Sequence, residues 1–218
     1  MAVTLANLRD SAKVFANMQV SDFLTDAEWA LFVNKAYRFL YARVTAKDPQ
    51  FRVTYTTPVT LTPSANSIAL PTGPSPAAFK DLVCVEKDPT TQQRRRLNPV
   101  GIRDTDEDIA YKIENQAVTI EPPWRCNGSF RIGYVPQVSD LADPAGAMDV
   151  ELEQFREFVE LKAAIYALAS DEQDITALAA LLSVETAAVD EWAMKRRKSD
   201  PDGVEDVRPR GGWTRWEP

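Results

Sequence analysis

The hydrophobic pattern changes its period twice along this 218-residue chain. Apolar residues recur at helical spacing before Asp48, alternate with polar residues through the middle of the chain, and return to helical spacing after Asp149. A period near 3.6 residues marks a helix with one buried face, and a period of two marks a half-buried strand. The sequence therefore predicts helices at both ends of the chain and a strand-rich lobe inserted between them.

The best-specified predicted element is a helix that begins after Thr25. Thr25 and Glu28 have the spacing of a capping box, in which each side chain binds a backbone N–H of the other residue. A shorter helix is predicted to start at Thr4. The apolar face of the longer helix is formed by Trp29, Phe32, Val33, Ala36, Tyr37, Leu40, Tyr41 and Val44.

Strand signals fill the middle of the chain. A hairpin is predicted around Glu114–Gln116, and residues 129–136 form the last expected strand. Most prolines lie here or near the C-terminus, as is typical of turns and edge strands. We therefore expect an antiparallel β lobe over residues 49–147. Its first alternating residues are Val53, Tyr55, Thr57, Val59 and Leu61.

Two further helices are predicted after Asp149, and together these elements define the expected fold. We expect an α+β, mainly helical protein with a four-helix bundle core, an inserted antiparallel β lobe and an extended C-terminal tail. Residues 1–48 and 148–198 would form the bundle, residues 49–147 the β lobe and residues 199–218 the tail. The apolar residues of the last two helices include Leu152, Phe155, Val159, Ile165, Ile175, Leu178, Leu182, Val189 and Trp192.

The composition argues against an enzyme. The chain has no histidine, which excludes Ser-His-Asp, Cys-His and histidine-based metal sites, and it has no glycine-rich phosphate-binding motif. Asp104, Asp106 and Asp108 resemble the start of a calcium loop, but Ile109 replaces the required glycine and Asn115 the required glutamate. We therefore expect no catalytic residue, no cofactor and no bound metal.

Charge and cysteine content narrow the possible partners. With 32 acidic and 25 basic residues the net charge is -7, which on average repels nucleic acid. The sequence has no signal peptide and no apolar run that would span a membrane, so we expect no membrane contact. Cys84 and Cys126 do not form a CxxC motif, which is typical of a reducing compartment, although a bridge between them stays open.

Basic residues gather in two clusters. Cations at a helix C-terminus complement the helix dipole, which is one interpretation of the second cluster; ion pairing with another subunit or a partner is the other. For the first cluster, an exposed loop and an interface are equally compatible with the sequence. The clusters are Arg94, Arg95 and Arg96, and Lys195, Arg196, Arg197 and Lys198.

The segment TDAEWALFVNKAYRFLY has a helix motif at Thr25, Glu28, Val33, Asn34, Ala36, Tyr37 and Leu40. It is followed by the strand segments 67–86, 111–123 and 128–136 and then by the helical segment 151–174. The motifs and their order resemble those of the head-to-tail adaptor, or connector, proteins of tailed bacteriophages.

This resemblance implies a structural role in the neck of the virion. Such adaptors, made in the host cytoplasm, form a ring, typically of twelve subunits, which docks on the portal protein and extends the DNA channel. DNA passes through without specific binding, and a tail or nozzle protein attaches below. The resemblance also implies a helical-bundle core with an inserted β part. The alternative function is a monomeric cytosolic module that binds a protein or a small ligand without catalysis.

The chain ends with the sequence GGWTRWEP, whose glycines and proline oppose regular structure. Within the interpretation above, residues 199–218 are predicted to dock on the portal through buried indole rings and arginine–carboxylate pairs. The alternative, that the rings fold back onto their own helices, stays open. The residues concerned are Arg208, Arg210, Trp213, Arg215 and Trp216.

Overall fold

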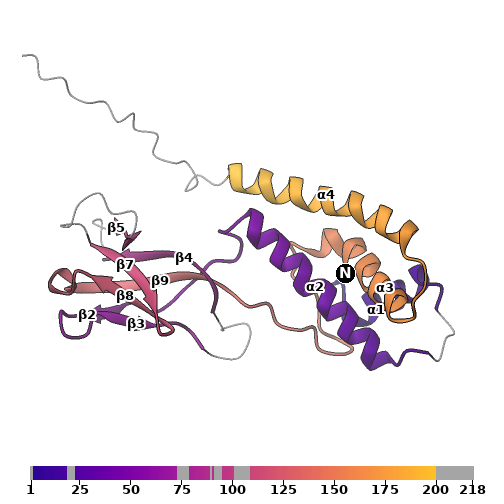
Figure 1. The fold of residues 1–218 in the computed structure, drawn as a ribbon, viewed down its shortest axis with the longest axis horizontal. Helices are drawn as coiled ribbons and strands as arrows, with labels where there is room; N and C mark the ends of the chain where they lie inside the picture. The colour runs from indigo at the N-terminus through magenta and orange to yellow at the C-terminus, as the bar shows by residue number, and fades with distance from the viewer. Residues whose placement is uncertain are drawn as a thin grey trace, which may run out of the picture.

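The computed structural model describes residues 2–18, 23–72, 79–88, 90, 95–100 and 109–199. Within this part, the helices lie at one end of the molecule and the strands at the other (Figure 1). Helices α1 (Leu5–Phe15) and α2 (Asp26–Lys47) precede the strands, and α3 (Arg156–Ser170) and α4 (Thr176–Ser199) follow them. The strand-rich part is thus inserted between α2 and α3.

Capping boxes start the first two helices, as the sequence predicts for α2. The backbone N–H of Glu28 donates to Thr25 Oγ1 at 3.3 Å, and the backbone N–H of Thr25 donates to Glu28 Oε2 at 2.8 Å. Thr4 and Asn7 form the equivalent pair at the start of α1. Both predicted starts are confirmed, because these side chains bind backbone groups that a helix start leaves without a partner.

Helix α3 is the most deeply buried helix of the described part. It contacts α1, α2 and α4, and most of its residues from Phe158 to Leu168 are buried. Helix α4 lies across α2 and α3 (Figure 1), and of its residues with described side chains only Val189 and Ala193 are fully buried. The four helices therefore differ in burial: α3 is enclosed, whereas α4 covers the others with one face.

The prediction of a mainly helical fold on a four-helix bundle core is wrong. Of the described residues, 44% are helical and 26% are in strands, which form two sheets of four and five strands, so this part of the chain is a mixed α/β fold. The core beside the helices also takes Phe51, Val135, Leu141 and Met148 from outside them. Periodicity identified the helices, but it carries no information on which other segments share their core.

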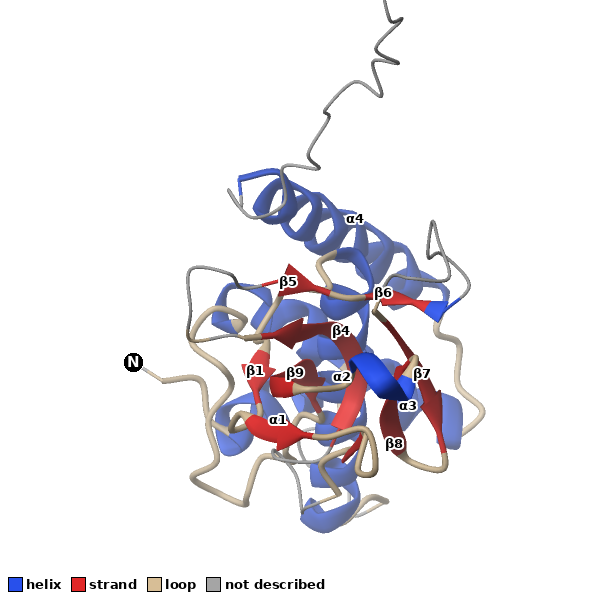
Figure 2. Cartoon of the chain, turned by 90° about the vertical axis from the view of Figure 1, so that its left-hand side faces the viewer, coloured by secondary structure: helices blue, strands red, loops and turns tan. Residues whose placement is uncertain are grey.

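The strands form two sheets (Figure 2). Buried side chains from both sheets form a second core. One sheet is antiparallel, in the order β1-β9-β4-β5, and β2 also pairs with β9. Its strands are β1 (Thr54–Tyr55), β2 (Val59–Leu61), β4 (Phe79–Lys87), β5 (Arg95–Arg96) and β9 (Gly128–Pro136).

The other sheet has the order β3-β8-β7-β6. Strands β7 (Ala110–Glu114) and β8 (Ala117–Glu121) form the predicted hairpin, with Asn115 and Gln116 in the left-handed region at φ 49° and 59°. Strand β3 (Ser67–Ala69) pairs antiparallel with β8, whereas β6 (Asn98–Pro99) pairs parallel with β7. The expectation of a wholly antiparallel lobe therefore fails at β6. The shared core includes Leu61, Ile68, Val85, Val118, Ile120, Phe130 and Ile132.

Two polar contacts join α2 to the segment that returns from the strands. Asn34 Nδ2 donates to the Leu141 carbonyl at 3.3 Å, and the Leu141 N–H donates to Asn34 Oδ1 at 2.7 Å. Tyr41 Oη donates to the Pro136 carbonyl at 3.3 Å. Asn34 is buried, so its reciprocal bonds satisfy a polar group that would otherwise destabilise the core.

Candidate functional site

Several of the predicted site residues lie outside the described part of the chain. These are the five residues of the predicted docking tail, Arg208, Arg210, Trp213, Arg215 and Trp216, together with Arg94 of the first basic cluster. The portal-docking role of these residues stays a prediction.

Arg95 and Arg96 form the short edge strand β5, which pairs with β4. Arg96 Nε lies 3.8 Å from Glu86 Oε1, and Arg131 Nε donates to Glu86 Oε2 at 2.7 Å. The Glu86 side chain has no exposed surface, so these guanidinium groups compensate a buried charge. Arg96 is therefore bound within its own molecule, whereas the exposed Arg95 side chain lies at the sheet edge.

The second basic cluster lies in the last turns of α4. Lys195 Nζ lies 2.6 Å from Glu191 Oε1 one turn earlier, an exposed pair of small energetic value. Arg196 binds two acids from other parts of the chain, as described below. Arg197 and Lys198 belong to α4, and their side chains lie outside the described part.

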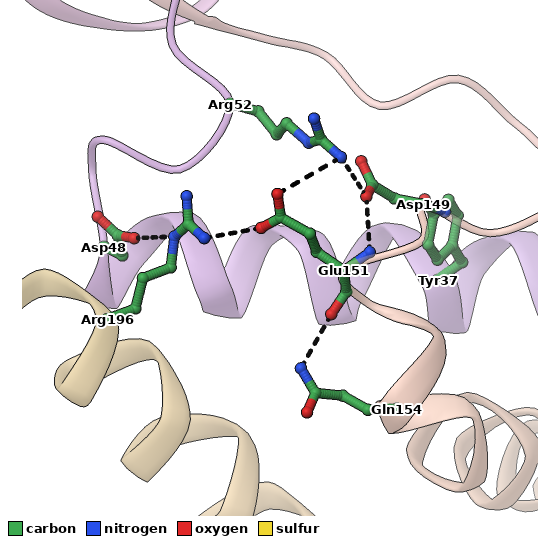
Figure 3. Close-up of polar contacts among 7 residues, drawn as sticks. All are labelled: Tyr37, Asp48, Arg52, Asp149, Glu151, Gln154 and Arg196. Atoms are coloured by element: carbon green, nitrogen blue, oxygen red, sulfur yellow. Dashed lines mark hydrogen bonds and ion pairs between the residues drawn. The ribbon is translucent and has the colours of Figure 1, made fainter. Parts of the chain in front are cut away.

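Arg196 begins a polar network at the junction of the helices and the strands (Figure 3). Arg196 Nε donates to Asp48 Oδ2 at 3.1 Å, and Arg196 Nη1 donates to Glu151 Oε2 at 2.7 Å. Asp48 is the buried C-cap of α2, and Glu151 precedes α3. One guanidinium therefore joins the ends of α2 and α4 to the segment that leads into α3.

Arg52 extends this network to the chain that enters the strands. Arg52 Nη2 donates to Asp149 Oδ1 at 2.5 Å and lies 3.9 Å from Glu151 Oε1, and its hydrogen bond to Asp149 raises the pKa of the Arg52 guanidinium. The Asp149 N–H donates to Tyr37 Oη at 3.0 Å, and burial raises the pKa of Tyr37. We call Tyr37, Asp48, Arg52, Asp149, Glu151 and Arg196 the junction network. It fixes the two crossings between helices and strands, so its role is structural.

The outer face of α4 is apolar and exposed. Leu181 and Val184 are 52% and 66% exposed, and small side chains continue the same face along the helix. We define the α4 outer face as Ala177, Ala180, Leu181, Val184, Ala187 and Ala188. Because contiguous exposed apolar surface is typical of a contact site, this face is the strongest candidate interaction surface on α4.

Trp124 is a second exposed apolar group, at the strand end of the molecule. It lies in the short 3-10 turn η2 (Pro123–Arg125), which follows β8, and its side chain is 73% exposed. An exposed tryptophan is typical of interface hot spots, so Trp124 adds a possible contact in the β lobe.

A groove of about 630 Å³ lies between α2 and the segments that flank the strands. Lys80 Nζ donates to Thr45 Oγ1 at 2.5 Å, and burial lowers the pKa of Lys80. Arg38 and Asp140 pair at 3.3 Å, and Tyr41, whose pKa burial raises to about 12, lines the groove. Because Arg38 is paired with Asp140 in this groove, Lys80 is the cation there that could bind an anionic ligand.

Other chemistry is limited in the described residues. No cluster of three or more His, Cys, Asp or Glu side chains there is arranged to hold a metal ion, and Cys84 and Cys126 are buried thiols without a disulfide. None of the helices searched combines the length and apolar character needed to cross a membrane.

Sequence reasoning missed the α4 outer face and the junction network for different reasons. The run ALAALL at residues 177–182 places apolar residues on every side of the helix, which is a signal that α4 has two apolar faces. The junction network has no such signal, because Arg196 and Asp48 are separated by 148 residues.

Comparison with known proteins assigns no family to this chain: neither a scan against protein-family models nor a search of curated proteins finds a match.

Proposed function

We propose that this chain is a structural head-to-tail adaptor of a tailed bacteriophage. Copies would form a ring in the neck of the virion, dock on the portal protein, extend the DNA channel and provide the platform to which the tail attaches. The succession of motifs from Thr25 to Asp174 supports the family, and the exposed apolar α4 outer face is the observation that carries an assembly role.

The α4 outer face is assigned to the portal protein. Leu181 and Val184 are already partly buried against their own molecule, and burying the exposed rest would contribute about 1 to 2 kcal/mol for each side chain, which favours a contact. Helix α4 also leads directly into residues 199–218, the segment that the sequence analysis expects to dock on the portal. A surface on α4 and the segment that follows it would then contact the same partner.

The charge of the chain suits a channel through which DNA must slide. Cationic walls would bind the phosphates and retard the DNA, whereas a net charge of -7 opposes such binding. Most arginines whose side chains are described pair with carboxylates of the same molecule. Arg43, for example, pairs with Asp190 at 2.7 Å. These features support passage of DNA without specific contacts.

The test uses purified full-length protein and purified portal rings. We expect the protein to sediment with the portal and to appear by cryo-electron microscopy as a ring beneath it. Leu181→Glu with Val184→Glu should abolish this docking, because two buried carboxylates would face the portal. Ala179→Glu, which places a negative charge at an exposed position of α4 outside this face, is the control and should still dock.

A second variant tests the segment that follows α4. Removal of residues 199–218 should leave the circular dichroism spectrum and the melting temperature nearly unchanged and weaken portal binding. Docking that is indifferent to both the α4 substitutions and this truncation would contradict the assignment of the portal contact. A protein that stays monomeric with portal present, and binds small carboxylates in the groove at Lys80, would instead support a ligand-binding module.

A further inference from the structure

Two lysines lie over one tyrosine ring between α2 and α3. Lys35 Nζ is 4.2 Å from the centre of the Tyr166 ring, and Lys162 Nζ is 5.2 Å from the same centre. Lys162 Nζ also lies 4.8 Å from the centre of the Phe39 ring. Among the described residues, neither lysine has a carboxylate within ion-pair distance.

The rings beneath these ammonium groups are held by packing. Phe39 stacks on the buried Phe158 with ring centres 6.2 Å apart, and Phe32 lies 6.4 Å from Tyr166. Phe39 is nevertheless 42% exposed, and Leu31, one turn before Lys35, is 64% exposed. We call Leu31, Lys35, Phe39, Lys162 and Tyr166 the lysine–aromatic patch. It combines rigid apolar surface with two cations, which is typical of interface hot spots.

The charge of Lys162 is disfavoured where this side chain lies in the isolated molecule. Desolvation, together with the positive charge of Lys35, lowers the pKa of Lys162. Elsewhere on the helices, Arg9 and Lys13 both lie within ion-pair distance of Asp26, and Arg38 pairs with Asp140. A carboxylate brought between the two ammonium groups of the patch would relieve their repulsion.

Exposed carboxylates of the same chain lie on the loop between α3 and α4. Glu172 and Asp174 are exposed, and no described cation lies within ion-pair distance of either. Asp174 accepts a hydrogen bond from the Thr176 N–H at 2.9 Å, and Asp171 accepts one from Gln173 Nε2. Among the described residues, Glu172 is the acid of this loop whose carboxylate accepts no hydrogen bond. Helix α3 ends at Ser170, about 12 Å along the helix axis from Lys162, so the loop of the same molecule starts well away from Lys162.

We propose that the lysine–aromatic patch binds the loop Asp171–Asp174 of a second copy of this chain. Charge complementarity supports this assignment. Among the described residues, Lys35 and Lys162 have no carboxylate within ion-pair distance, and Glu172 and Asp174 have no cation within ion-pair distance. The exposed Leu31 and Phe39 favour a protein over DNA, since phosphates make no use of apolar side chains. The contact would join neighbours in the proposed ring, and to that extent it rests on the proposed function.

The experiment is a charge exchange in the full-length protein, followed by sedimentation velocity at low and high salt. Wild-type protein should associate with itself, less strongly at high salt. Lys35→Glu with Lys162→Glu, and separately Asp171→Lys with Glu172→Lys, should each weaken association by about tenfold or more, because like charges then face each other. Mixing the two variants should restore a salt-sensitive complex, because each supplies the charge that the other lacks.

Two controls separate this contact from general effects of charge and from misfolding. Lys47→Glu changes an exposed lysine elsewhere on α2 and should leave association unchanged. Lys35→Met with Lys162→Met keeps the apolar stems, should not lower the melting temperature, and should still weaken association. This variant also tests the inference if the glutamate variant fails to fold.

Three results would overturn the inference. The first is self-association of the wild type that neither the patch variants nor the loop variant weakens. The second is a wild-type protein that is monomeric without the portal, together with a Lys35→Glu, Lys162→Glu variant that forms portal-bound rings as well as the wild type does. The third is a Lys35→Glu, Lys162→Glu variant that associates with itself as the wild type does but no longer binds a short DNA duplex that the wild type binds. The patch would then bind the phosphates of a nucleic acid. Rescue by charge exchange in a protein that does not bind portal would uphold this contact and refute the adaptor function instead.

Discussion

At the scale of single residues, Glu160 shows what burial does to a charged group inside the helices. Its side chain lies in α3, is 5% exposed, and has Arg156 Nε at 3.9 Å from Oε1. Desolvation raises the pKa of Glu160, although a hydrogen bond with Ser11 and the charge of Arg156 oppose this effect, and Glu157 adds to it. The ionised form is therefore less favourable in the folded than in the unfolded protein.

The first prediction concerns Glu160→Gln. Because the folded pKa is raised above the unfolded value of 4.5, the folded state binds more protons between these two values. The free energy of unfolding of the wild type, relative to Glu160→Gln, should therefore fall as pH rises from 4.5 through the folded pKa, and stay level above it. Urea unfolding at several pH values measures this difference. A difference that grows in favour of the wild type with rising pH would contradict the burial argument.

The second prediction concerns Gly133 in β9, which pairs with Cys84 of β4 and Tyr55 of β1. A Cβ atom at Gly133 would lie 2.7 Å from Cys84 Sγ and 2.9 Å from Tyr55 Cε1, closer than van der Waals contact allows. Gly133→Ala should therefore lower the free energy of unfolding by about 1 to 3 kcal/mol.

Cys84→Ala provides the control for this clash. In the double variant, Gly133→Ala should cost less than it does alone, because the Sγ atom that it meets is gone. Equal costs in both backgrounds, measured by chemical unfolding, would show that the contact with Cys84 Sγ is not the source of the destabilisation.

At the scale of secondary-structure elements, α2 and α4 show how much more the sequence says about a helix start than about a helix surface. The start of α2 is encoded locally by Thr25 and Glu28. The packing of α4 depends on Trp192, whose ring lies 5.3 Å from Phe155 and 6.1 Å from Phe51, two residues that periodicity does not connect with α4. Local capping was therefore predictable, whereas the partner of each helix face was not.

The third prediction tests the capping box of α2. Thr25→Ala removes the hydroxyl that accepts from the Glu28 N–H, and should lower the free energy of unfolding by about 1 kcal/mol. Thr25→Ser keeps a hydroxyl in the same place and should change stability little. Thermal unfolding followed by circular dichroism measures both variants. Equal effects of Ala and Ser would show that the cap is not the source of the stability.

At the scale of the whole molecule, the junction network connects segments from four parts of the chain (Figure 3). Arg196 also lies over the Phe51 and Trp192 rings, with its guanidinium carbon 5.3 Å and 5.9 Å from the ring centres. The end of α4 is thereby held against both the end of α2 and the start of the strands.

The fourth prediction concerns Arg196→Met, which keeps the apolar stem and removes the charge. The nearly buried carboxylate of Asp48 would lose its ion pair, so the free energy of unfolding should fall by about 1 to 3 kcal/mol. Hydrogen exchange should increase near the C-terminal end of α4. Lys195→Met, one residue earlier, removes only an exposed pair with Glu191 and should have almost no effect. Similar losses in the two variants would contradict a structural role for the junction network.

Some residues of the candidate site could be predicted from the sequence, and others could not. The sequence shows the basic cluster that contains Arg196. It does not show that Arg196 binds Asp48 and Glu151 of the same molecule, because ion-pair partners far apart in the sequence leave no local signal. The lysine–aromatic patch joins Lys35 of α2 to Tyr166 of α3, again across the whole strand region. The predicted docking residues from Arg208 to Trp216 lie outside the described part of the chain.

The sequence alone determined where helices and strands form, because capping residues and hydrophobic periods act over a few neighbouring positions. The helix starts at Thr4 and Thr25 and the hairpin at Asn115 and Gln116 follow from such local rules. Only the tertiary structure decided that the fold is mixed α/β with two cores, that β6 pairs parallel, and that α4 has one apolar face left in water. These features depend on contacts between residues distant in the chain, whose free energies are set by which surfaces meet after folding.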